Sequence, residues 1–416
     1  MSRLLPLGLA VLIAFSWLSV ANAICTDSTI GADIIIYGMH VDNKDFDDDS
    51  SDAMGKWTEK VKIHLINTYS DKIKTVIRFD AKTYDSSKPS LEVNRAYIEM
   101  QEFLHEDVTL KVGKLSWSWQ MRRSFGSTAY YDLVYGDLEA TFLMDIKPLG
   151  WDVKYKLNAD ISLAAGWGKA KEASVAGNND NDIDIIFIRY DQKLSEANKF
   201  FVALLFFIDR YEPTAGTWTM TGDIWYLNAG IDYFLMEEEL ELYLEFAYQG
   251  GDPHNPLMDF GAMAVNVGLE YTFQDVSNIP YVCIDITWLQ GEDGNTYGFQ
   301  RYYSNWNRTL IAESQALGGV WNRPGYLAFK LMVGMKSISS DKYGVDFILG
   351  WFKADGDLPI GTGNGLGWEF DIIGAYYYNE DVAFTAGLGY FSADEDLGGI
   401  DPDSTIMLLW GMHIFF

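Results

Sequence analysis

Charged side chains recur at every second position along many stretches of this sequence, with apolar side chains between them. Arg78, Asp80 and Lys82, for example, alternate with Phe79 and Ala81. Because residues two apart lie on the same face of a β-strand, each such stretch has one polar and one apolar face. Ammonium, guanidinium and carboxylate groups in rows could guide charged or dipolar solutes. The spacing therefore predicts strands that present this chemistry on one side only.

The charged residues predicted for the polar face divide by position along the chain. The basic group is mainly early and consists of Lys60, Lys62, Arg78, Lys82, Arg95, Lys111, Lys154 and Lys156. The acidic group is late and consists of Asp232, Glu241, Glu245, Glu270, Asp285, Asp346, Glu369 and Asp371. In a closed ring of strands the two groups would face each other across a channel and set up a transverse field. The alternative is that they only hydrate a bore or pair with loops.

The alternating stretches are about ten residues long, the length of a tilted strand that crosses a membrane. Tight polar turns separate them at eight places, for example at Ser70–Lys72 and Asn379–Asp381, and longer polar segments lie between the resulting hairpins. Eight hairpins and one strand at each end predict an all-β, antiparallel transmembrane β-barrel of about eighteen strands, with sixteen as the alternative. Leu138–Ile146 also alternates, but we place it inside the third long loop, or as an extension of the strand at Trp151–Leu157.

The apolar faces carry aromatic residues near the strand ends, as Trp57, Trp167, Trp288, Trp351 and Tyr390 illustrate. Two girdles of aromatic residues at the membrane interfaces would give this pattern. A soluble β-sandwich would have shorter strands with polar outer faces, so it fits less well.

Composition excludes several classes of function. The chain has 59 acidic and 31 basic residues and a formal net charge of -28, which argues against a nucleic-acid partner. Its 2 cysteines cannot form a disulfide framework or a cysteine-rich zinc site. We find no metalloprotease, serine-hydrolase or nucleotide-binding motif, and we expect neither enzymatic activity nor a cofactor.

The N-terminus has the pattern of a secretory signal peptide. Arg3 precedes an apolar run from Leu4 to Val20, and Ala21-Asn22-Ala23 then supplies small residues at a cleavage site. We expect residues 1–23 to be a signal peptide cleaved after Ala23 and residues 24–416 to form the barrel.

The C-terminal stretch resembles the terminal strand of bacterial outer-membrane β-barrel proteins. Its apolar face consists of Ile406, Leu408, Trp410, Met412, Ile414 and Phe416. With the strand count, this resemblance extends to the porin superfamily. More weakly, Asn94–Glu99 and Leu110–Lys114 resemble paired strands of the alginate-export family. The resemblance implies a bacterial outer-membrane location, with lipid and lipopolysaccharide around the barrel. It also implies insertion by the barrel-insertion machinery, which would read Phe416.

From this resemblance we expect a porin channel for small hydrophilic solutes, with anionic or sugar-like solutes as candidates. The alternatives are an alginate-type polysaccharide export pore and a plugged structural or adhesive barrel. Either a monomer or a trimer is compatible with the pattern. The third outer loop, near residues 115–150, is expected to fold inward and narrow the pore. Its candidate solute-binding residues are Trp117, Trp119, Arg122, Arg123, Tyr130 and Tyr131.

Clustered carboxylates in the outer loops suggest divalent-cation binding. The candidate calcium ligands are Asp47, Asp48, Asp49, Asp394 and Asp396. A solvated acidic rim is the alternative, because none of these clusters has the spacing of an EF-hand loop.

Overall fold

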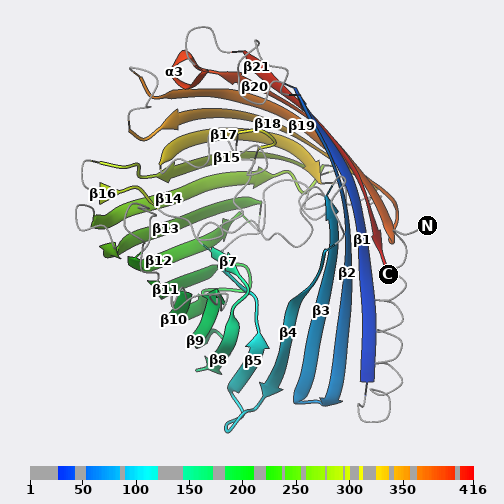
Figure 1. Ribbon diagram of the computed structural model, residues 1–416, viewed down its shortest axis with the longest axis vertical. Helices are drawn as coiled ribbons and strands as arrows, with labels where there is room; N and C mark the ends of the chain where they lie inside the picture. The colour runs from blue at the N-terminus through cyan, green and yellow to red at the C-terminus, as the bar shows by residue number, and fades with distance from the viewer. Residues whose placement is uncertain are drawn as a thin grey trace, which may run out of the picture.

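The computed structural model describes most of the chain from residue 27 onward. The described ranges are 27–42, 53–84, 90–119, 144–171, 183–209, 222–236, 239–253, 259–276, 279–293, 296–299, 309–312, 325–336, 342–356, 363–398 and 403–416. Within them the chain forms an all-β, closed antiparallel barrel of 18 strands with almost no helix (Figure 1). This confirms the fold class and strand count expected from the alternation.

The barrel strands in the first half are β1 (Asp27–Asp42), β2 (Met54–Ser70), β3 (Ile73–Tyr84), β4 (Ser90–Gln101), β5 (Val108–Lys114), β8 (Leu149–Lys156), β9 (Ile161–Lys171), β10 (Ile183–Lys193) and β11 (Lys199–Asp209). Those in the second half are β12 (Gly222–Leu235), β13 (Leu240–Pro253), β14 (Asp259–Thr272), β15 (Pro280–Leu289), β17 (Tyr326–Lys336), β18 (Tyr343–Ala354), β19 (Gly365–Asn379), β20 (Val382–Ala393) and β21 (Ser404–Phe415). Three short strands, β6 (Trp117–Trp119), β7 (Met144–Ile146) and β16 (Thr296–Tyr297), and one short helix, α3 (Glu395–Gly398), belong to the connections.

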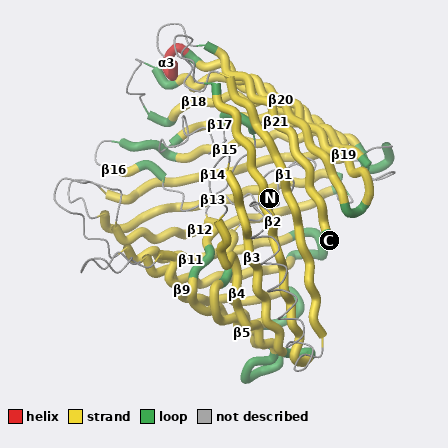
Figure 2. Tube along the Cα trace, turned by 45° about the vertical axis from the view of Figure 1, so that its right-hand side comes forward, coloured by secondary structure: helices red, strands yellow, loops and turns green. Residues whose placement is uncertain are grey.

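The first and last strands pair with each other and close the ring. The antiparallel β1–β21 register runs from Asp33 opposite Phe415 to Asp42 opposite Ile406. Backbone hydrogen bonds between Ala32 and Phe416 extend it by one residue, at 2.8 and 3.3 Å. Figure 2 shows β1 and β21 side by side. Closure leaves no unpaired barrel edge at this seam.

The wall has an apolar outer face, whereas its inner face is polar on some strands and apolar on others. The exposed large side chains include Ile186, Leu204 and Leu227 of neighbouring strands. Inward residues of these strands, such as Phe187 and Phe201, are apolar and buried, whereas other strands bury carboxylates. An exposed apolar outer face is expected where lipid covers the outside.

Short and long connections alternate at the places that the sequence predicts. Two-residue and other tight turns join β2 to β3 and β19 to β20, whereas 115–148 and 290–325 form the longest connections. Of the stretch at 138–146, only Met144–Ile146 is described, and this part lies in the connection between β5 and β8, as expected, without extending β8. Its described end, β7, instead pairs with β6 in a separate two-stranded sheet, with Trp117 opposite Ile146.

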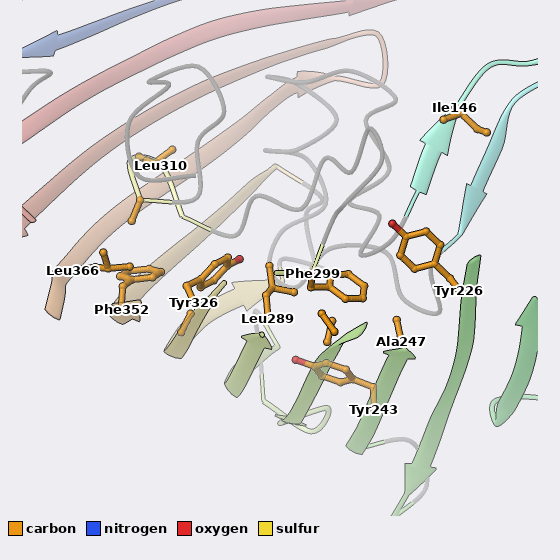
Figure 3. Packing of buried hydrophobic residues seen from close by; sticks show 14 of the residues in the cluster. Ile146, Tyr226, Tyr243, Ala247, Leu289, Phe299, Leu310, Tyr326, Phe352 and Leu366 are labelled. Carbon is orange, nitrogen blue, oxygen red and sulfur yellow. The ribbon is translucent and has the colours of Figure 1, made fainter. Parts of the chain in front are cut away.

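A hydrophobic cluster lies inside the ring and extends from β10 to β21 and on to β1. It joins inward-facing residues of the wall, such as Tyr226, Phe352 and Leu366, to Phe299 and Leu310 of the connection between β15 and β17 (Figure 3). In the described part of the chain, no helix has the length and apolar character needed to cross a membrane.

Candidate functional site: the inner wall of the barrel

We call the inner faces of the barrel strands β2–β8, which carry the predicted basic residues, the early wall, and those of β12–β19, which carry the predicted acidic residues, the late wall. On the early wall, a buried carboxylate binds neighbouring polar side chains. Asp80 of β3 accepts a 2.8 Å hydrogen bond from Arg78 Nε and another of 2.8 Å from the Asn94 amide of β4. Lys62 stands directly opposite Asp80 on β2, and all of these side chains are buried. The hydrogen bond to Asp80 holds the planar guanidinium of Arg78 in place, so its positive charge stays on the wall.

The remaining basic groups of the early wall are less covered. Lys111 lies 3.6 Å from Glu99 and its side chain is 36 % exposed, and Lys82 lies 3.4 Å from Glu92 and is 24 % exposed. Lys60 and Arg95 are partly exposed, while Lys154 and Lys156 of β8 are exposed. Of the predicted basic residues, only Lys62 and Arg78 are therefore buried.

The acidic residues of the late wall differ, because every one of them is buried. Asp232, Glu241, Glu245, Glu270, Asp285, Asp346, Glu369 and Asp371 are all 7 % exposed or less. Several have partners within the wall: Asp346 accepts from the Tyr281 hydroxyl at 2.6 Å and Glu245 from the Asn228 amide at 3.1 Å. The sequence pattern led us to expect two open walls of opposite sign. Of the predicted charged residues, the structure instead leaves only basic ones accessible.

Asp285 is the centre of the most extensive polar network on the late wall. One carboxylate oxygen lies 2.8 Å from Lys330 Nζ, and the other accepts from the Tyr243 hydroxyl at 2.5 Å and the Asn266 amide at 2.8 Å. Thr287 donates to the first oxygen, the one beside Lys330, at 3.2 Å. Lys330 thus neutralises a carboxylate that sequence reasoning treated as part of a solute-facing row.

The root of the third loop packs on the inner wall. Trp117 donates a 3.0 Å hydrogen bond from its indole to Asp152 of β8 and contacts Phe187 of β10 edge to face, with ring centroids 4.9 Å apart. Arg122, Arg123, Tyr130 and Tyr131, and the side chain of Trp119, lie outside the residues that the structure describes. The constriction by this loop therefore stays a prediction.

The two described calcium candidates accept backbone hydrogen bonds, one from their own connection and one from the start of β19. Asp394 accepts from the backbone of Asp396 at 3.2 Å, and Asp396 accepts from Gly365 at 3.0 Å. Asp47, Asp48 and Asp49 lie outside the described ranges. Among the described residues, no group of three or more His, Cys, Asp or Glu side chains is arranged to hold a metal ion.

Sequence reasoning missed the uncharged members of the inner wall and the inserted segment Thr309–Ala312. Tyr243, Asn266 and Thr287 occupy alternate inward positions, so strand parity could have identified them. The inserted segment follows no strand pattern and lies within the expected outer loop at 291–325. Only its short apolar run could have drawn attention to it.

No family model and no curated protein matches the chain. Among solved structures, it is similar to Pseudomonas aeruginosa OccK5 (OpdH), with 12 % identity, a TM-score of 0.62, and 94 % of this chain and 99 % of that chain covered. It is also similar to Pseudomonas aeruginosa OprD, at 12 % identity, TM-score 0.59 and coverages of 94 % and 96 %. Acinetobacter baumannii OccAB4 is similar as well, with 13 % identity, a TM-score of 0.59, and 94 % of this chain and 99 % of that chain covered. These are outer-membrane porin barrels, and the chain has their fold.

Proposed function

We propose that the chain is an outer-membrane channel for small hydrophilic solutes and that anionic solutes pass preferentially along its early wall. The outer location is supported by the apolar exterior and by the porin-type fold, and the expected signal peptide at 1–23 fits export.

The observation that carries the anion preference is the unequal burial of the two charge groups. The acidic residues of the late wall are covered and several are paired, whereas Lys82, Lys111, Lys154 and Lys156 remain accessible. A solute in the bore would then meet mainly positive charge, even though the whole chain carries -28. Carboxylates on exposed loops and turns act over only about 8 Å at physiological salt.

The test is the reversal potential of the channel in a planar bilayer under a salt gradient. We expect a wild-type channel that prefers anions, and a shift toward cations in Arg95→Gln/Lys111→Gln. The control is Lys193→Gln/Lys199→Gln, which removes the same charge at the turn between β10 and β11. A wild-type channel that strongly prefers cations, with a double variant that behaves identically, would refute the proposed preference.

A plugged structural or adhesive barrel is the second candidate, because a hydrophobic cluster and an inserted segment occupy part of the interior. The same bilayer recording separates the two, since a plugged barrel would carry no current. No observation of the wall favours the alginate-type export pore, which stays a prediction from the resemblance.

A further inference from the structure

Four consecutive residues of the connection between β15 and β17 lie inside the barrel against β19. Thr309, Leu310, Ile311 and Ala312 are each 3 % exposed or less. The Leu310 N–H donates to Asp371 Oδ2 at 3.0 Å, and those of Ile311 and Ala312 donate to the two oxygens of Glu369 at 2.5 and 2.6 Å. A buried backbone N–H group left without an acceptor costs about 1–3 kcal/mol. Two side chains of one strand therefore bind three successive backbone groups.

The neighbouring wall is shaped to receive this segment. A Cβ atom at Gly389 would lie 3.1 Å from Leu310 Cβ and 3.2 Å from Ile311 Cδ1, and one at Gly387 would lie 3.3 Å from Leu310 Cδ1. Both glycines are on β20, next to β19. Figure 3 shows Leu310 over the inner side of the wall, in the same cluster as Phe352 and Leu366. Small residues at these positions let the segment approach closely.

The same connection has a second anchor on the opposite side of β15. Its first part, β16, pairs in parallel with β14, with Tyr297 opposite Phe260. Phe299 contacts Tyr226 of β12 edge to face, at a centroid distance of 5.8 Å. The connection is therefore held by aromatic packing at β12–β14 and by carboxylates at β19. It is thus bound to the wall on both sides of β15 and β17, the two strands that it joins.

We propose that Glu369 and Asp371 are positioning residues that latch this connection inside the barrel, and that the latched segment sets the width of the path beside it. The proposal deepens the proposed function, since it assigns the narrowing of the channel to specific wall residues. It also gives a role to two carboxylates of the inner wall that are buried, so that a solute in the bore could not reach them. Removing their acceptor oxygens should release Thr309–Ala312 while leaving the β19–β18 and β19–β20 ladders intact.

Cysteine accessibility tests the latch without requiring any ion current. Ile311→Cys is made in a full-length chain whose native Cys25 and Cys283 are replaced by Ala, and is labelled with a water-soluble maleimide. We expect slow labelling with the latch intact and an increase of about tenfold or more in Glu369→Ala/Asp371→Ala, the order expected for losing buried hydrogen bonds. Asp346→Asn, a change to another buried wall carboxylate whose hydrogen bond from Tyr281 stays within the wall, should leave the labelling rate unchanged.

Conservative variants separate a latch from a general packing role. Asp371→Asn keeps an oxygen for the Leu310 N–H group, whereas Glu369→Gln places an NH₂ group against the N–H group of Ile311 or Ala312. The labelling rate should therefore rise more in Glu369→Gln than in Asp371→Asn. Heat-dependent migration on a detergent gel shows that each variant still forms a barrel. Equal labelling in all folded variants, or rapid labelling in the parent, would overturn the latch.

Single-channel conductance then tests the effect on width. Glu369→Ala/Asp371→Ala should conduct more than the parent, by a measurable increase in open-channel current. If labelling rises but conductance does not, the segment is latched but does not set the width, and that half of the proposal fails. If labelling rises while no variant conducts, the latch holds and the channel function is the part that fails.

Discussion

Lys330 and Asp285 form an ion pair in which neither side chain is exposed, with Nζ and Oδ1 2.8 Å apart. The desolvation of two buried charges offsets much of their attraction, so the pair itself contributes little net stability. Removing one partner has a larger effect, because it leaves the other charge buried without compensation.

We expect Lys330→Met to destabilise the barrel by about 3 kcal/mol, as is usual when one member of a buried pair is lost. Lys330→Met/Asp285→Asn should recover part of this loss, because the substituted amide would carry no charge and the donors Tyr243 and Asn266 would keep an acceptor. The measurement is the urea concentration at which the folded gel band disappears. A double variant less stable than Lys330→Met would contradict the argument.

At this scale the sequence predicts where a side chain points but not what covers it. Strand parity correctly directs Asp285 and Glu369 away from the apolar outer face. Their burial depends on partners far away in sequence, Tyr243 for Asp285 and Ile311 for Glu369. Alternation contains no information about such contacts, so accessible and buried charges look alike in the sequence.

Among the connections, long segments do more than join strands. The root of the loop between β5 and β8 forms the β6–β7 pair and contacts β8 and β10 through Trp117. The connection between β15 and β17 is anchored at β12–β14 and at β19. Both interior contacts depend on wall residues contributed by other hairpins.

We expect Trp117→Ala to loosen the root of the third loop and raise the channel's conductance. The change removes a hydrogen bond to Asp152 and an aromatic contact with Phe187, which together contribute about 2 kcal/mol to the anchorage. Single-channel recording is the measurement. Trp151→Ala is the matched control, because Trp151 is on the outer face and 40 % exposed, and its loss should leave the current unchanged. Equal currents in wild type and Trp117→Ala would show that this root does not limit flow.

Strands and turns were predictable because alternation with period two and polar turn residues act locally. The interior contacts of the loops were not, since loop sequences obey no period and their wall partners come from other hairpins. The stretch at 138–146 illustrates the difference. Its alternation is genuine β-structure at Met144–Ile146, but the partner is β6 in the same loop rather than a barrel neighbour.

For the molecule as a whole, closure links the two ends of the chain. The β1–β21 register joins residues near both termini, so the ring is complete only when its last strand is in place. Such long-range pairing is expected to make a closed barrel fold slowly.

We expect the mature protein to begin at Ile24, to be recovered with the outer membrane, and to migrate faster on a detergent gel before boiling than after it. Closure explains the migration, because a compact ring resists detergent unfolding. N-terminal sequencing and membrane fractionation complete the measurement. Recovery in the inner membrane or an uncleaved leader would contradict the expected targeting.

A substitution at Phe416 can separate insertion into the membrane of a cell from the stability of the folded barrel. Its backbone bonds to Ala32, but its side chain is 74 % exposed and adds little to the wall. Phe416→Ala should therefore refold in detergent to a barrel as stable as the wild type, within about 0.5 kcal/mol, yet accumulate less in the outer membrane of cells. Comparison of the refolded yield with the cellular yield checks this. Equal loss in both would assign the residue a structural role instead.

The contact between Ala32 and Phe416 also means that the order of strands around the ring need not be the order in which they are made. A short linker from Phe416 to Asp27, with new ends opened at the turn between β10 and β11, would give a circular permutant with the same neighbours for every strand. That molecule would have the same wall but no terminal phenylalanine. Its yield in the outer membrane would show whether a cell recognises the shape of the barrel or a free C-terminal strand that carries Phe416.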